Sequence, residues 1–178
     1  MRIVVSGSHA SGKSSLIADF AALHPEFEVL GDPFELIDDA GEEPDAGTFF
    51  AQLRYAAARL RTLPSGADVV AERGPLDFLA YLDALDALGR PGRSSGLQER
   101  GAAIVAETAP SIDLLVLLPL SGSGIDVPDD EDPALRDEMD AALLELADDP
   151  DLVGGARVIE LVGDPAQRLD QLLQALQA

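Results

Sequence analysis

Short apolar runs alternate with longer amphipathic segments along almost the whole chain. Continuous apolar runs of this kind are typical of strands that are buried on both faces of a sheet. They predict five strands, at residues 2–6, 27–30, 68–71, 113–118 and 157–162.

The segments between these runs carry apolar residues at helical spacing. In the first of them, Leu16, Ile17, Phe20 and Leu23 fall on one helical face. Alternating strands and helices predict an α/β fold with helices on both faces of a parallel sheet. A length of 178 residues suits a single domain. The predicted helices cover residues 13–23, 49–63, 76–88, 95–109, 133–147 and 165–177.

A glycine-containing segment, GSHASGKS at residues 7–14, joins the first predicted strand to the first predicted helix and is called the phosphate loop below. It fits the pattern G-x-x-x-x-G-K-[ST], in which backbone amides and the helix N-terminus bind phosphate oxygens. An ordinary strand-to-helix turn is the alternative, but such a turn needs no lysine, and Lys13 is the only lysine in the sequence.

The phosphate loop predicts binding of ATP and Mg²⁺. Lys13 would neutralise the β and γ phosphates, and the Ser14 hydroxyl would ligate the metal, with Ser15 as a weaker candidate. We expect His9 to be a spacer, because this chemistry needs no imidazole. The predicted ATP-binding residues are Gly7, Ser8, His9, Ala10, Ser11, Gly12, Lys13, Ser14 and Ser15.

Composition narrows the classes of partner. The formal net charge of −21 would repel nucleic acids and anionic membranes, so neither is expected to bind. The longest apolar run, residues 114–118, is too short to cross a bilayer. No cysteine is present, and the chain starts with a predicted strand instead of a signal peptide. We therefore expect a cytoplasmic protein, and a homodimer is left open.

Charged residues follow the second and third predicted strands, at the edge of the sheet where α/β proteins bind ligands. Asp32 can take the proton of a hydroxyl acceptor, Glu72 can hold Mg²⁺, and Arg73 can bind transferring phosphates. Each has an alternative. Asp32 can instead form a turn or cap a helix at residues 34–39, and Glu72 and Arg73 can form a surface ion pair.

Two helices carry candidate acceptor-binding residues. Gln52 and Arg59 lie two helical turns apart and share one face. Gln52 can hydrogen-bond a base, and Arg59 can bridge carboxylates such as Asp32 and Asp77. The alternatives are a solvated helix face for the first pair and, for Asp77, an interaction with the N-terminal dipole of its helix.

Together these segments resemble the P-loop kinases of nucleosides and nucleotides, especially the deoxynucleoside kinases, thymidylate kinase and small AAA-type domains related to ribosylnicotinamide kinase. The resemblance covers almost the whole chain. It rests on GSHASGKSS, Asp32-Pro33, Phe50-x-Gln52 followed by Arg59, Glu72-Arg73, and a late helix with Arg136 after an acidic loop. The segment GPLDFLAYLDAL, which follows Arg73, is most similar to the ribosylnicotinamide kinase-related group.

The resemblance implies a three-layer P-loop NTPase fold with strand order 2-3-1-4-5 and a lid at about residues 121–140. It also implies that Asp32 is the base, that Gln52 contacts the acceptor and that Arg136 acts from the lid. Three departures stand out: aspartate replaces the usual glutamate at position 32, the lid has a single arginine, and Gly74 replaces a serine. The implied activity is transfer of the γ-phosphoryl of ATP to a nucleoside, nucleotide or other small metabolite. The alternative is an ATP-binding or ATPase switch module without an acceptor.

Overall fold

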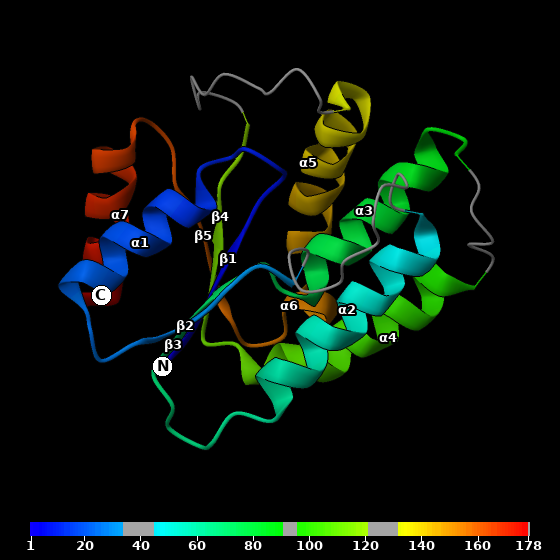
Figure 1. The fold of residues 1–178 in the computed structure, drawn as a ribbon. Coiled ribbons are helices and arrows are strands. Elements are labelled where there is room, and N and C mark those ends of the chain that lie inside the picture. Colours follow the sequence, from blue (N-terminus) through cyan, green and yellow to red (C-terminus); the bar gives the residue numbers. More distant parts are fainter. Residues whose placement is uncertain (34–44, 91–95, 121–131, 178) are drawn as a thin grey trace.

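Five parallel strands form a sheet with the order β2-β3-β1-β4-β5. The predicted strand order is therefore confirmed, and so is the α/β class. The computed structural model describes residues 1–33, 45–90, 96–120 and 132–177 (Figure 1). The strands are β1 (Arg2–Ser6), β2 (Glu28–Leu30), β3 (Val69–Glu72), β4 (Leu114–Leu117) and β5 (Arg157–Glu160).

Helices cover both faces of the sheet (Figure 1). One face packs against α1 (Lys13–Leu23) and α7 (Pro165–Gln177). The other face is covered by a larger group that meets at α3, the helix packed against both α2 and α5. That group comprises α2 (Ala46–Arg61), α3 (Pro75–Ala87), α4 (Leu97–Thr108) and α5 (Pro133–Ala147), with the short α6 (Pro150–Val153) beside α4.

Alternate side chains of β1 enter two separate cores. Ile3 and Val5 pack with Phe20 of α1, whereas Val4 packs with the cluster around Phe78 of α3. All five are fully buried. A strand buried on both faces in this way produces an unbroken apolar run in the sequence, which is why the run predicted β1 correctly.

The element boundaries differ from the predicted ones by a few residues. α2 begins at Ala46 and not at residue 49, because Asp45 caps it by accepting a hydrogen bond from the Thr48 amide at 2.8 Å. Phe27 lies outside β2 and packs edge-on against Phe20. The four-residue helix α6 was not predicted, since it is too short to show a periodic pattern.

Two predicted features lie partly or wholly outside the described residues. They are the helix at 34–39 and most of the lid, of which the structure describes only the residues from Asp132 onward. These residues belong to α5, whose first turn is capped by Asp132. Within the described ranges, no helix has the length and apolar character needed to span a membrane.

Candidate active site

The phosphate loop presents an open helix N-terminus. Gly12, at φ 92°, precedes α1 without a side-chain cap, and the first turn of α1 contains no acidic residue. Ala10 also has a positive φ of 51°, which is uncommon for a residue with a side chain. A Cβ at Gly7 would lie 2.6 Å from Ser11 Oγ and 3.0 Å from the Leu118 carbonyl oxygen, so a larger residue there would force its neighbours to shift. Uncapped amides at a helix N-terminus bind anions.

Lys13, the predicted ligand of the β and γ phosphates, is buried within the phosphate loop. Only 4% of it is exposed, and its Nζ donates to the Ser8 carbonyl oxygen at 2.7 Å. Burial, followed by the charge of Arg73, lowers the pKa of Lys13 to about 7. The buried hydroxyls of Ser8 and Ser11 have no hydrogen-bond partner among the described residues. A phosphate chain would supply the negative charge and the polar partners that these groups need, so the loop fits a nucleoside triphosphate.

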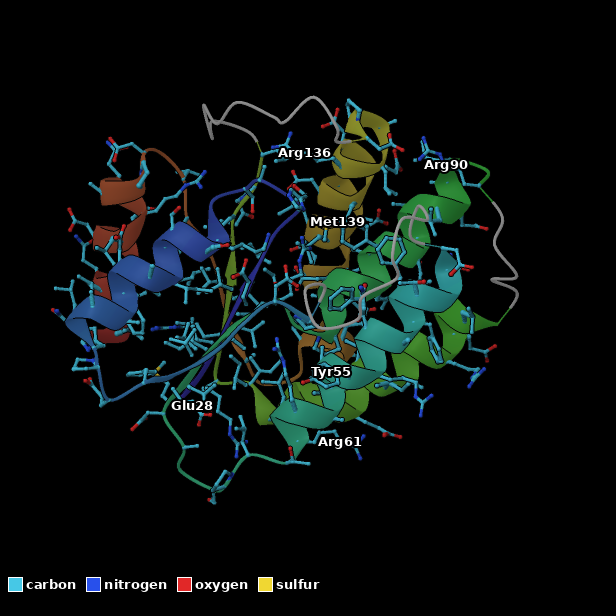
Figure 2. The ribbon with its side chains drawn as sticks, in the orientation of Figure 1. Glu28, Tyr55, Arg61, Arg90, Arg136 and Met139 are labelled. Atoms are coloured by element: carbon cyan, nitrogen blue, oxygen red, sulfur yellow. The ribbon has the colours of Figure 1, made fainter. Side chains whose placement is uncertain are left out.

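Two arginines reach the phosphate loop from distant helices. Arg136, near the start of α5, donates through Nε to the His9 carbonyl at 2.9 Å. Figure 2 shows Arg136 in the first turn of α5, next to the loop that follows β1. Arg168 of α7 donates through Nη1 to the Ser11 carbonyl at 2.7 Å. Arg136 is one of the predicted site residues, whereas Arg168 was not predicted. The one signal for Arg168 in the sequence is its place four positions before the buried Leu172, on the same helical face.

Ser14 and Glu72, the two predicted metal ligands, lie together. The Ser14 hydroxyl donates to Glu72 Oε1 at 2.8 Å. Hydroxyl and carboxylate oxygens suit Mg²⁺, which takes most of its remaining ligands from water and phosphate. No group of three or more histidine, cysteine or acidic side chains suited to a metal occurs in the described ranges. These two residues therefore fit a metal that arrives with a nucleotide rather than one held by the protein alone.

Arg73 and Asp32 form a buried ion pair, which excludes a surface pair between Glu72 and Arg73. Arg73 Nε lies 2.8 Å from Asp32 Oδ2, and only 1% of Arg73 is exposed. Arg73 also donates to the Gly7 carbonyl at 3.2 Å and lies over the ring of Tyr81. Burial alone would lower the pKa of Arg73, but the charges of Tyr81, Asp32 and Asp77 raise it above its usual range. Arg73 therefore stays charged and ties Asp32 to the phosphate loop.

Arg59 binds backbone carbonyl groups at the ends of two neighbouring strands. Its guanidinium donates to the carbonyl of Gly31, to that of Glu72 at 2.7 Å and to that of Arg73 at 2.9 Å. These carbonyl groups lie at the carboxyl ends of β2 and β3. Arg59 therefore stabilises the edge of the sheet at which Asp32 lies. Arg73 also contacts Asp32, at 2.8 Å, and the bridging of carboxylates by Arg59 remains a prediction.

Asp77 caps a helix and supports the phosphate loop. It is completely buried, and its carboxylate accepts from Ser6 Oγ at 2.6 Å, the Gly7 amide at 3.0 Å and the Gly74 amide at 2.8 Å. Burial raises the pKa of Asp77, and Arg73 and these hydrogen bonds act in the opposite direction. This geometry favours the helix-terminus alternative over contact with an acceptor.

Gln52 is a buried amide in need of a partner. It is 1% exposed, and its Oε1 accepts no hydrogen bond from any described residue. In the same helix Phe49 stacks on Tyr81, with ring centroids 4.5 Å apart, and Tyr81 in turn contacts Arg73. The predicted role of Gln52 in binding an acceptor remains a prediction.

A groove of about 530 Å³ lies between α3 and α5, and its lining is acidic. Asp83 of α3 faces Glu138 and Glu145 of α5, with Asp148 and Asp149 at one end. A lining of carboxylates repels phosphates. The phosphate loop, where cationic side chains converge, is therefore the part of the described structure that suits an anion.

Comparison with known proteins gives structural relatives at low sequence identity. No protein-family model and no curated protein sequence matches the chain. The thymidylate kinase from Candida albicans has a TM-score of 0.67 at 15% identity, over 99% of this chain and 90% of that chain. A deoxyadenosine kinase from M. mycoides with bound dATP has a TM-score of 0.69 at 11% identity, over 100% of both chains. The same enzyme with bound dCTP has a TM-score of 0.64 at 13% identity, over 99% of both chains. The chain thus has the fold of the P-loop kinases that act on nucleosides and nucleotides.

Proposed function

We propose that this protein is an ATP-dependent phosphotransferase that moves the γ-phosphoryl of ATP to a nucleoside, a nucleotide or a related small acceptor. The observation that carries the proposal is the Arg73 guanidinium, which binds both the Asp32 carboxylate and the Gly7 carbonyl of the phosphate loop. A carboxylate beside the phosphate loop supports the proposal, because transfer to a hydroxyl needs a group that takes its proton.

Each part of the site has a task in this reaction. The amides of the phosphate loop and Lys13 hold the triphosphate, and Ser14 and Glu72 hold Mg²⁺. The metal, when bound, neutralises charge on the β and γ phosphates. Asp32 accepts the proton of the acceptor hydroxyl while the hydroxyl oxygen bonds to the γ phosphorus. The bond from the γ phosphorus to the β–γ bridging oxygen breaks, and ADP leaves with that oxygen. Arg136 and Arg73 add positive charge around the transferring group.

Gln52 is the acceptor contact that this function would explain. Its buried Oε1 has no partner in the described part of the chain, and an unsatisfied buried acceptor destabilises a fold that binds nothing there. An amide can pair with the hydrogen-bonding edge of a nucleobase.

An ADP-release assay over a panel of nucleosides, nucleotides and small alcohols tests the proposal. At least one acceptor should stimulate turnover, and Lys13→Ala should lower the rate by ~10² or more. Asp32→Asn should abolish transfer while ATP still binds, since the asparagine oxygen can still accept a hydrogen bond from Arg73 but cannot take the proton of the acceptor. Failure of every acceptor to stimulate ADP release would count against a kinase.

A regulatory ATP-binding module is the second candidate, and one observation favours it. The Asp32 carboxylate already binds Arg73, an arrangement that also suits a purely structural ion pair. In this case ATP would raise the Tm and change the oligomeric state or the binding of a partner, without need of an acceptor. Nucleotide-dependent size-exclusion profiles together with a silent acceptor panel would support it.

A further inference from the structure

Cationic side chains hold four carbonyl groups of the phosphate loop. They come from four different parts of the chain, namely the residue after β3 and the helices α1, α5 and α7. The contacts are Arg73 to Gly7 O at 3.2 Å, Lys13 to Ser8 O at 2.7 Å, Arg136 to His9 O at 2.9 Å and Arg168 to Ser11 O at 2.7 Å.

Holding a carbonyl fixes the direction of the amide on the same peptide. The described peptides are all trans, so each C=O and the N–H bonded to the same carbon point in opposite directions. With the Ser11 carbonyl bound by Arg168, the Gly12 amide points away from Arg168. Arg168 therefore orients one of the amides that open the N-terminus of α1.

Arg168 is also a buried positive charge without a neutralising partner. It is 3% exposed, and its Nε and Nη2 have no hydrogen-bond partner among the described residues. No carboxylate of the described ranges forms an ion pair with it. An uncompensated buried charge is costly, and a bound polyphosphate beside it would lower that cost.

We propose that Arg168 is a positioning residue for the donor nucleotide, which orients the Ser11–Gly12 peptide toward the phosphate chain and adds fixed positive charge beneath it. This inference rests on the proposed function. It extends the donor site to α7, a helix that the loop motif does not include.

Binding of ADP and AMP, each with Mg²⁺, separates this role from a structural one. Arg168→Gln should weaken ADP binding by roughly tenfold or more, as measured by titration calorimetry, because it removes a charge-assisted hydrogen bond. The loss should be larger for ADP than for AMP, whose single phosphate places less charge in the loop. Arg168→Lys, which keeps a charge and a donor, should recover part of the ADP affinity.

Arg157→Gln is the matched control. Arg157 is exposed, and its guanidinium donates to the Ala175 carbonyl of α7, so the variant loses the same charge and also a contact with α7. It should bind ADP like the wild type. If Arg168→Gln does not fold, Arg168→Met, which keeps the apolar stem of the side chain without its charge, takes its place.

ADP affinity that is unchanged in Arg168→Gln or Arg168→Met, or equal losses for ADP and AMP, would overturn the positioning role. If the wild-type protein binds neither nucleotide, the proposed function itself is wrong. A loss confined to the Arg168 variants and greater for ADP supports the inference.

Discussion

The guanidinium of Arg73 links Asp32 to the phosphate loop, with Nε 2.8 Å from Asp32 Oδ2 and Nη1 3.2 Å from the Gly7 carbonyl. The backbone of Arg73 has a φ of 59°, in the left-handed region that non-glycine residues seldom occupy. Backbone strain of this kind persists where the surroundings hold a residue firmly, and it concentrates at functional sites. Arg73 is thus held in place by its own side-chain contacts.

Arg73→Lys should lower both stability and turnover. An ammonium group cannot bind Asp32 and Gly7 with the fork geometry of a guanidinium, so we expect a loss of about 3 kcal/mol in urea unfolding. Arg61→Lys is the control, because Arg61 forms an exposed ion pair with Glu107 at 3.2 Å. It should change stability by less than ~0.5 kcal/mol. Similar losses in the two variants would show that the buried pair has no special role.

Asp77→Asn tests whether Asp77 supports the loop. Asparagine keeps one oxygen and replaces the other with an NH₂ group. In either orientation of its amide, that NH₂ faces a backbone N–H, of Gly7 or of Gly74, which can only donate. We expect a loss of ~2 kcal/mol in unfolding free energy and weaker ATP binding. An unchanged Tm combined with a raised KM for the acceptor alone would restore Asp77 as an acceptor-binding residue.

Gln52→Leu should separate stability from acceptor binding. Because the Gln52 Oε1 lacks a partner among the described residues, replacing the amide with an apolar side chain should leave the Tm unchanged or raise it. The KM for the acceptor should rise by ~10-fold or more, while ATP affinity stays constant. A lower Tm without any change in the acceptor KM would assign Gln52 to the fold.

Stability should fall as pH rises above the ordinary range of aspartate. Burial raises the pKa of Asp83; Asp86 and Glu145 add to this, and a hydrogen bond from Gln98 opposes it. The folded state then keeps a proton that the unfolded state has lost, so stability declines from about pH 4 up to the raised pKa.

Asp83→Asn should therefore flatten the dependence of Tm on pH and raise the Tm by about 1–2 °C at pH 7.5. Asp19→Asn removes the same charge from an exposed position of α1 and is the control. If the two variants have the same pH profile, the effect belongs to net charge and not to the site of Asp83.

The local features of the fold were predictable, whereas the partners of long side chains were not. The apolar run of β1 and the helical spacing after Lys13 are local patterns. The strand and the helix that they predicted are both confirmed. Arg59 and Arg73 both lie near Asp32, and the sequence does not say which guanidinium turns toward it. Arg168 contacts Ser11 across 157 positions, a relationship that no local pattern contains.

The contacts between the phosphate loop and the two late helices also set an order of events during synthesis. Arg136 and Arg168 follow 127 and 157 positions after the residues that they contact, so the loop is synthesised well before either arginine. A nascent or truncated chain that ends before α7 would contain the complete loop motif but would lack the Arg168 side chain that binds the Ser11 carbonyl. Nucleotide binding would then mature only after α7 has been made.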